Sequence, residues 1–254
     1  MPERSGTQVL ERGVVLLREI SEQNHQGSKL VDLVARTGLD RSTVHRILKC
    51  LVTEQLLTFD SSSKRYRLGP LAFYMGLMRS MEGNLRDAAA PVLSQIAGET
   101  GDTVFLMVKV GVEAICADRR EGSYPIKTLV VDVGTRRPLG IGAGGTAILA
   151  SLSDDDIETA MAMNASRIAQ FPAISQDSVR DAVASTKKNG YALTDVPTLT
   201  GVKAIGYPIC PRGRQAVAAF SIAAVAPRIS PQRTAFLLSV LKNAANELVS
   251  TLNT

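Results

Sequence analysis

Residues 30–54, LVDLVARTGLDRSTVHRILKCLVTE, constrain the fold more than any other stretch of this 254-residue chain. Their pattern predicts two short amphipathic helices separated by a turn at residues 37–39. The apolar residues of the second helix recur at helical spacing and form one face: Val44, Ile47, Leu48 and Leu51. The polar residues of the same helix line the opposite face: Ser42, His45, Arg46 and Lys49. A helix that is buried on one side and basic on the other is suited to the DNA major groove.

A basic hairpin follows these helices. Residues 56–59 and 65–68 are predicted strands around the turn DSSSK, and residues 8–21 form a further amphipathic helix before them. Three helices followed by a hairpin indicate a winged helix-turn-helix. The candidates for contact with base edges are Arg41, Ser42, Thr43, His45 and Arg46. The candidates for contact with phosphate are Lys49, Lys64 and Arg65.

The charge distribution favours the same interpretation. Residues 1–80 carry 12 Lys and Arg against 8 Asp and Glu, whereas residues 81–254 carry 17 against 16. The positive excess therefore lies where phosphates would be met. No stretch is long and apolar enough for a membrane span or an export signal, so we expect a cytoplasmic protein with no membrane partner. Cys50, Cys116 and Cys210 form no spaced pair and are predicted to be reduced core residues.

The remainder of the chain predicts an α+β domain with antiparallel strands. Residues 103–110 and 112–118 form a hairpin around Gly111, and residues 202–210 and 216–226 form another. Residues 126–133 are predicted to form a further strand. Helices are predicted at residues 85–100, 145–151, 154–165 and 175–189, and a closing helix from residue 231.

Residues 140–145, GIGAGG, match the GxGxxG pattern of dinucleotide-binding loops. The context argues against that reading, because a Rossmann fingerprint needs a strand before the glycines and a full helix after them. The two remaining interpretations are a tight loop packed on a sheet and a loop whose backbone N–H groups meet a small anion. We favour the anion-binding loop.

Two alternatives to a regulator are a small-molecule-binding enzyme that carries a winged domain and an architectural DNA binder. The chain has only two histidines, His25 in a linker and His45 on the predicted reading helix. No Ser-His-acid, Cys-His or metal cluster can be assembled in the C-terminal part without them. We therefore predict no catalytic residues, no metal and no cofactor.

Three segments of the sequence resemble those of a known family. LDRSTVHRILKCLVTEQLL, VGTRRPLGIGAGGTAILASL and NGYALTDVPTLTGVKAIGYPI occur in the same order as in IclR-type transcriptional regulators. The resemblance implies a winged helix-turn-helix at residues 1–69, a linker helix at 70–84 and a GAF-like effector-binding domain at 85–254. It also implies a double-stranded DNA operator, a small-molecule effector such as an organic acid or aromatic metabolite, and repression or activation of a catabolic operon. Such proteins form homodimers and often tetramers.

Carried over by position, the resemblance implies an effector pocket with these residues: Ala143, Gly144, Gly145, Thr194, Asp195 and Ser221. The chain departs from the family where many members have a histidine and a Gly-Lys pair, since it has Gly140 and Gly145-Thr146. Val196-Pro197 replaces the usual acidic pair. With fewer polar side chains, we infer a larger or less polar effector. Met107 and Ile126 are candidates for its apolar side, although core packing is the favoured role of each.

Overall fold

The chain divides into two compact units, residues Met1–Glu82 and Gly83–Thr254. The computed structural model describes residues 7–24, 26–72, 75, 85–211 and 215–252. Most of the linker helix predicted at residues 70–84 lies outside the described residues. Among the helices of the described ranges, none has the length and apolar character needed to cross a membrane.

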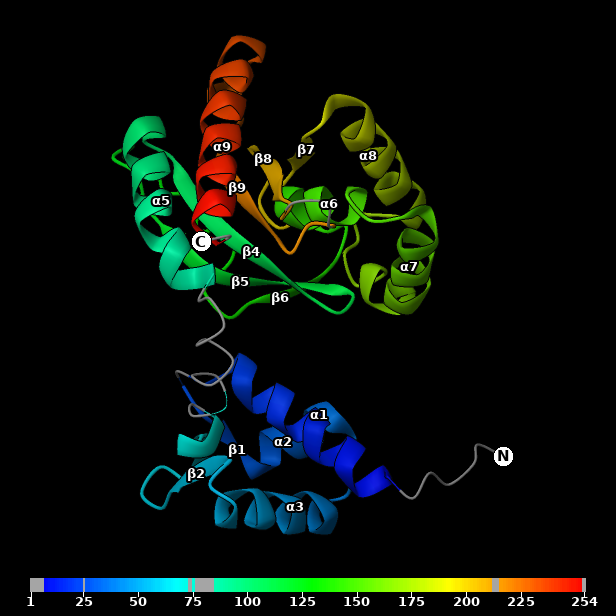
Figure 1. The fold of residues 1–254 in the computed structure, drawn as a ribbon. Helices are drawn as coiled ribbons and strands as arrows, with labels where there is room; N and C mark the ends of the chain where they lie inside the picture. Colours follow the sequence, from blue (N-terminus) through cyan, green and yellow to red (C-terminus); the bar gives the residue numbers. More distant parts are fainter. Residues whose placement is uncertain (1–6, 25, 73–74, 76–84, 212–214, 253–254) are drawn as a thin grey trace. The chain divides into compact units, whose positions relative to one another are not determined.

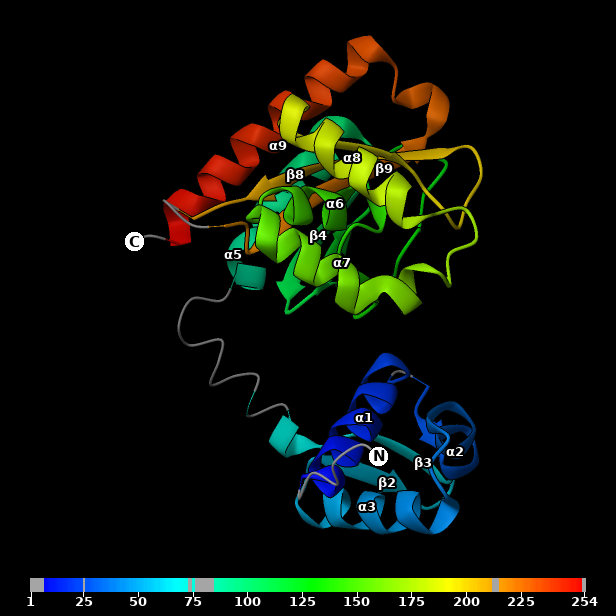
Figure 2. The same cartoon turned by 90° about the vertical axis from the view of Figure 1, so that its right-hand side faces the viewer.

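In the described part of the N-terminal unit, α1, α2 and α3 lie beside a small antiparallel sheet (Figure 2). Its elements are α1 (Gln8–Glu22), β1 (Ser28–Lys29), α2 (Leu30–Thr37), α3 (Arg41–Thr53), β2 (Leu57–Asp60) and β3 (Arg65–Leu68). The strands lie in the order β1-β3-β2, and the β2–β3 hairpin pairs Asp60 with Arg65 next to its turn. The predicted winged helix-turn-helix is therefore confirmed.

The turn between α2 and α3 has a local explanation. Gly38 ends α2 in the left-handed conformation, with φ of 67°, which a residue with a side chain rarely adopts. Asp40 then begins α3, and its carboxylate accepts a hydrogen bond from the Thr43 backbone N–H at 2.9 Å. The core beneath the helices comprises Leu16, Ile20, Leu33, Val44, Ile47, Leu48, Leu57 and Tyr66.

A six-stranded antiparallel sheet organises the C-terminal unit, with strand order β6-β5-β4-β9-β8-β7. The strands are β4 (Thr103–Val110), β5 (Glu113–Arg120), β6 (Arg136–Pro138), β7 (Ala192–Asp195), β8 (Val202–Ile209) and β9 (Ala218–Val225). Strand β9 is buried along all but its last residue, as expected of a strand whose sequence is apolar except at Ser221. The pairing of β4 with β5 is irregular between Leu106 and Met107.

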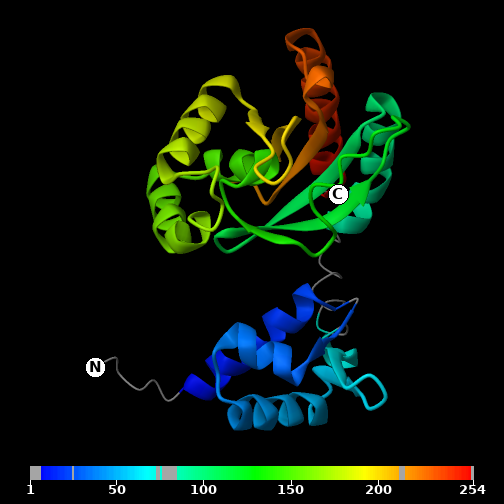
Figure 3. The same ribbon diagram turned by 180° about the vertical axis from the view of Figure 1, so that it is seen from behind.

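Helices cover both faces of this sheet (Figures 1 and 3). One face packs on α5 (Leu85–Thr100) and α9 (Pro231–Leu252). The other face carries α6 (Gly142–Ala150), with α7 (Asp154–Ile168) and α8 (Gln176–Asn189) beyond it. This arrangement confirms the predicted α+β class.

The strand predicted at residues 126–133 is wrong. The edge position beside β5 is taken by Arg136–Pro138, and residues 126–133 form an irregular loop. Side chains bind the carbonyl groups of this loop in place of a neighbouring strand. Arg137 donates to the Val130 carbonyl oxygen at 2.9 Å, and Arg119 donates to that of Val131 at 3.3 Å.

The cysteines only partly follow the prediction. All three are free thiols, but only Cys116 is buried, whereas Cys50 and Cys210 are exposed. Cys50 lies on the solvent side of α3, and Cys210 follows the last residue of β8. Burial raises the pKa of the Cys116 thiol to about 12, so this thiol stays protonated at neutral pH.

Candidate functional site

Helix α3 separates a buried face from a polar one. Its buried residues, Val44, Ile47 and Leu48, pack into the core of the N-terminal unit. The residues predicted to read base edges lie on the other side, where all but the half-buried Thr43 are exposed: Arg41, Ser42, Thr43, His45 and Arg46. Lys49 is exposed on the same helix. One solvent-facing surface thus gathers the side chains that a major-groove reader needs.

The cations of α3 are not neutralised by nearby acids. Within the described residues, no ion pair joins Arg41, Arg46 or Lys49 to a carboxylate, whereas Arg36 on α2 pairs with Glu19 at 3.0 Å. Guanidinium and ammonium groups without an acidic partner keep their donors available for phosphate or guanine. The structure therefore supports the predicted reading helix on charge as well as on exposure.

Asp40 sets the conformation at the start of this surface. Ser42 Oγ donates to Asp40 Oδ1 at 2.6 Å, and the Thr43 N–H donates to the same oxygen. The hydrogen bonds from Ser42, and then those from Thr43, hold the pKa of the Asp40 carboxyl well below its usual range. The Ser42 hydroxyl proton is thereby engaged, so Ser42 would contact DNA through its oxygen as an acceptor.

The two wing residues that were predicted to contact phosphate differ in their surroundings. Lys64 is exposed in the β2–β3 turn, with a φ of 57°. Arg65 is half-buried, and its guanidinium donates to the Gly27 carbonyl oxygen at 2.6 Å. Arg65 therefore fastens the wing to the segment before β1, a role that the sequence pattern did not reveal.

A cavity opens in the C-terminal unit between the first turn of α6 and the sheet. About 400 Å³ of space between atoms lies in and in front of it, a volume that includes open solvent. Most of its lining is apolar and comes from β4, the 126–133 loop and the segment after β7: Phe105, Met107, Val130, Val131, Val196 and Pro197. The polar part of the lining includes Arg137 and Ser221.

The glycine-rich stretch forms the first turn of α6, where it lies close to the sheet. A Cβ on Gly144 would lie 2.6 Å from Met107 Cγ, and one on Gly206 of β8 would lie 2.3 Å from the Ala143 carbonyl oxygen. Only glycine allows the two backbones to come this near. Neither a parallel sheet nor a long outgoing helix is present here, because the sheet is antiparallel and α6 spans nine residues. The structure therefore agrees with rejecting the dinucleotide-binding reading.

Arg137 is a cavity residue that the sequence reasoning did not assign. It is half-buried in the middle of β6 and is the one charged side chain in the described lining. Burial lowers the pKa of its guanidinium from the usual value, which reports the cost of removing this charge from water. The pair Arg136-Arg137, which lies shortly before the glycines in the sequence, could have indicated a cation in the cavity lining. The sequence alone does not show which of the two arginines faces the cavity.

Comparisons with known proteins identify the family. Residues 79–250 match the family described as bacterial transcriptional regulator IclR C-terminal, and residues 9–61 match the IclR helix-turn-helix domain. The chain belongs to the IclR family. Members of this family are DNA-binding transcriptional regulators and not enzymes, so the enzyme alternative is wrong.

Several relatives span nearly the whole IclR-family chain. The HTH-type transcriptional regulator KipR of Bacillus subtilis is 28% identical over 225 residues, covering 86% of this chain and 87% of that protein. The transcriptional repressor IclR of Escherichia coli is 26% identical over 252 residues, covering 97% and 90%. An IclR homolog from Microbacterium hydrocarbonoxydans, solved in complex with 4-hydroxybenzoate, has a TM-score of 0.76 at 21% identity, covering 96% of this chain and 99% of that one.

The cavity includes part of the effector site that the IclR resemblance implied. The lining residues among those predicted are Ala143, Gly144, Gly145, Ser221 and the apolar Met107. Thr194 and Asp195 of β7 are not part of the lining: Asp195 is exposed, and Thr194 Oγ1 is buried without a hydrogen-bond partner in the described residues. Ile126 is also outside the lining, with 58% of its surface exposed.

Proposed function

We propose that this IclR-family regulator controls a catabolic operon in response to a small organic acid with an apolar, preferably aromatic, body. The observation that carries the proposal is the cavity beside α6, because its lining is mostly apolar and its polar part includes Arg137, Ser221 and the first turn of α6. A helix N-terminus and a guanidinium both favour an anion. The 4-hydroxybenzoate bound by the Microbacterium hydrocarbonoxydans homolog is an aromatic acid of this kind.

For DNA recognition, we propose that two copies of the chain read a palindromic operator as a homodimer, with a tetramer as the larger assembly. In each copy, Arg41 and Arg46 contact base edges, with guanine as the expected partner of an arginine. Ser42, Thr43 and His45 provide further contacts along the groove, and Lys49 and Lys64 contact phosphate. The exposure of α3 supports this assignment, as does the absence of ion pairs between its cations and the carboxylates of the described residues.

We further propose that residues 70–84 connect the reading domain of residues 1–69 to the effector domain of residues 85–254. Effector binding would change how this connection spaces the two reading domains in the cytoplasmic dimer. Such coupling between two sites is worth about 1–3 kcal/mol, or roughly 5–150-fold in affinity for DNA. Its direction, release from the operator or tighter binding, decides between repressor and activator.

The test combines thermal unfolding with DNA binding. The full chain is screened by thermal shift against benzoate, 4-hydroxybenzoate and short-chain acids, and its preferred duplex is obtained by selection from a random pool. We expect at least one acid to raise the melting temperature and to change affinity for the selected duplex by roughly 5–150-fold. Acids that stabilise the chain without changing DNA affinity would refute the coupling. If no acid stabilises the chain but the duplex is bound, an architectural DNA binder is the better description.

A further inference from the structure

The two arginines of β6 meet different partners. Neighbouring residues of a strand point to opposite sides, so Arg136 and Arg137 cannot both face the cavity. Arg136 forms an ion pair with Glu113, a buried carboxylate that Arg167 also contacts. Arg137 lines the cavity instead. Arg136 is therefore paired with Glu113 on one side of the strand, and Arg137 is the cation that lines the cavity on the other side.

Arg137 differs from the other shielded arginines of the C-terminal unit in having no acidic partner. Arg228 and Arg233 share Asp102, and Arg119 pairs with Asp132 at 2.9 Å. For Arg137, the described residues provide a carbonyl oxygen, that of Val130, and no carboxylate within ion-pair distance. A guanidinium has five N–H donors, and a shielded charge is costly unless it is paired. The arrangement therefore leaves charge and donors for an anion from outside the chain.

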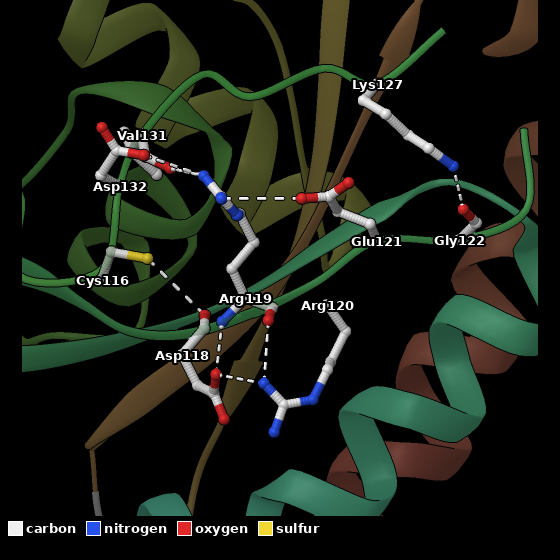
Figure 4. Close-up of polar contacts among 9 residues, drawn as sticks. All are labelled: Cys116, Asp118, Arg119, Arg120, Glu121, Gly122, Lys127, Val131 and Asp132. Atoms are coloured by element: carbon white, nitrogen blue, oxygen red, sulfur yellow. Dashed lines mark hydrogen bonds and ion pairs between the residues drawn. The ribbon is translucent and has the colours of Figure 1, made fainter. Parts of the chain in front are cut away.

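The surrounding structure holds this guanidinium in place. The Val130 carbonyl that accepts from Arg137 belongs to the loop between β5 and β6. Arg119 fixes the next residue of that loop, since it donates to the Val131 carbonyl and pairs with Asp132 (Figure 4). Arg137 therefore needs little reorganisation to bind a ligand, which favours affinity.

A second positive element lies beside Arg137. The position of a Cβ on Gly142, the first residue of α6, would be 3.8 Å from Arg137 Nη1. The N–H groups of a first helical turn lack partners within the helix, and the helix dipole adds partial positive charge there. With one cation in the described lining and apolar residues over most of the rest, this end of the cavity suits one carboxylate and the rest suits its apolar body.

We propose that Arg137 binds the carboxylate of the effector and makes the cavity selective for apolar monocarboxylates over their neutral analogues. The proposal rests on the effector function proposed above and specifies its chemistry. A charge-assisted, two-pronged contact between guanidinium and carboxylate is available to an acid and not to an amide of the same shape. Ser221, on the β9 side of the cavity, is a neutral polar neighbour and does not discriminate by charge.

The test compares an acid with its neutral isostere in matched variants. Calorimetry on the full chain measures binding of benzoate and of benzamide to the wild type, Arg137→Gln, Arg137→Lys and the control Arg180→Gln. Arg180 is an exposed arginine of α8 that pairs with Glu158 outside the cavity. We expect the wild type and the control to prefer benzoate by at least about tenfold. Arg137→Gln should lose about 10–100-fold in benzoate affinity and keep its benzamide affinity within about threefold, and Arg137→Lys should retain part of the preference for the acid.

Other outcomes separate this proposal from the one on which it rests. If the wild type binds both compounds equally, or if Arg137→Gln keeps the preference for benzoate, Arg137 does not select the acid, although the cavity remains an effector site. If neither compound binds the wild type, the aromatic-acid cavity and the role of Arg137 are both refuted. Benzamide binding retained by Arg137→Gln shows that its cavity is folded, so that a lost preference for benzoate is caused by the changed side chain.

Discussion

Two adjacent basic residues of the wing should respond differently to substitution. Lys64 is exposed in the turn, and no ion pair involving it occurs among the described residues. The Arg65 guanidinium donates to the Gly27 carbonyl oxygen at 2.6 Å. We therefore expect Lys64→Ala to weaken DNA binding through lost charge. Arg65→Ala should instead destabilise the N-terminal unit.

The expected magnitudes follow from these contacts. Each phosphate contact contributes about 0.9 to the slope of log affinity against log salt concentration, so Lys64→Ala should lower the slope by about 0.9 for each bound copy. Over a fourfold range of salt, that slope change corresponds to about threefold in affinity for each copy. Arg65→Ala loses a charge-assisted hydrogen bond worth about 1.5–3 kcal/mol. The slope of this variant should stay within about 0.3 of the wild-type slope.

Both quantities can be measured on the full chain. Fluorescence anisotropy with a duplex of random sequence, between about 50 and 200 mM salt, gives the slope. Hydrogen exchange of peptides from residues 8–53 reports opening of the N-terminal unit alone. Lys188→Ala, at an exposed position of α8, is the matched control and should change neither quantity. The reasoning is refuted if Arg65→Ala lowers the slope as much as Lys64→Ala does and leaves exchange unchanged.

Three further substitutions test the reading helix, the α6 contact and a buried ion pair. Arg46→Ala should weaken the free energy of binding to the selected duplex by about 1–3 kcal/mol and relax the sequence preference at one base step. Repeating the selection with this variant measures the preference, and unchanged specificity would exclude Arg46 from base contact. Gly206→Ala should lower the free energy of unfolding of the C-terminal unit by about 1–3 kcal/mol, measured in urea, because the added Cβ would meet a carbonyl oxygen. In the control Gly98→Ala, the added Cβ has nothing within 4 Å, so the free energy of unfolding should rise by about 0.5–1 kcal/mol. Asp102→Ala should lower the free energy of unfolding by about 3 kcal/mol in the same assay, because Arg228 loses its partner in a shielded site. A loss below about 1 kcal/mol would show that this ion pair does not stabilise the unit.

The reading domain could be predicted from the sequence because its signals are local. The spacing of Val44, Ile47 and Leu48 within one helix identifies the buried face whatever surrounds it. Gly38 and Asp40 mark the end of one helix and the start of the next through their own backbone and side-chain chemistry. The side chains that face solvent on α3 follow from the same periodicity. Arg65 was the exception, because its partner, Gly27, lies 38 residues earlier.

The effector cavity was less predictable because distant segments decide it. Residues 126–133 are apolar enough for a strand, but the edge of the sheet is occupied by β6. Which of the two arginines of β6 faces the cavity depends on the position of Glu113 in the neighbouring strand. The glycines of α6 suggested an anion loop, yet their close contacts with Met107 and with Gly206 of β8 appear only in the assembled sheet.

If Arg137 binds the effector as proposed, the unfavourable free energy of burying its charge is relieved when the effector binds. Without a ligand, the cavity holds a partly desolvated cation that has a carbonyl oxygen for a partner, which lowers the stability of the C-terminal unit. A bound carboxylate removes that cost, so binding energy and folding stability are linked through one side chain. Replacing Arg137 by a leucine would remove the cost permanently. The resulting domain should be more stable than the unliganded wild type but unresponsive to acids, because a ligand can shift an equilibrium only by its differential affinity for the states involved.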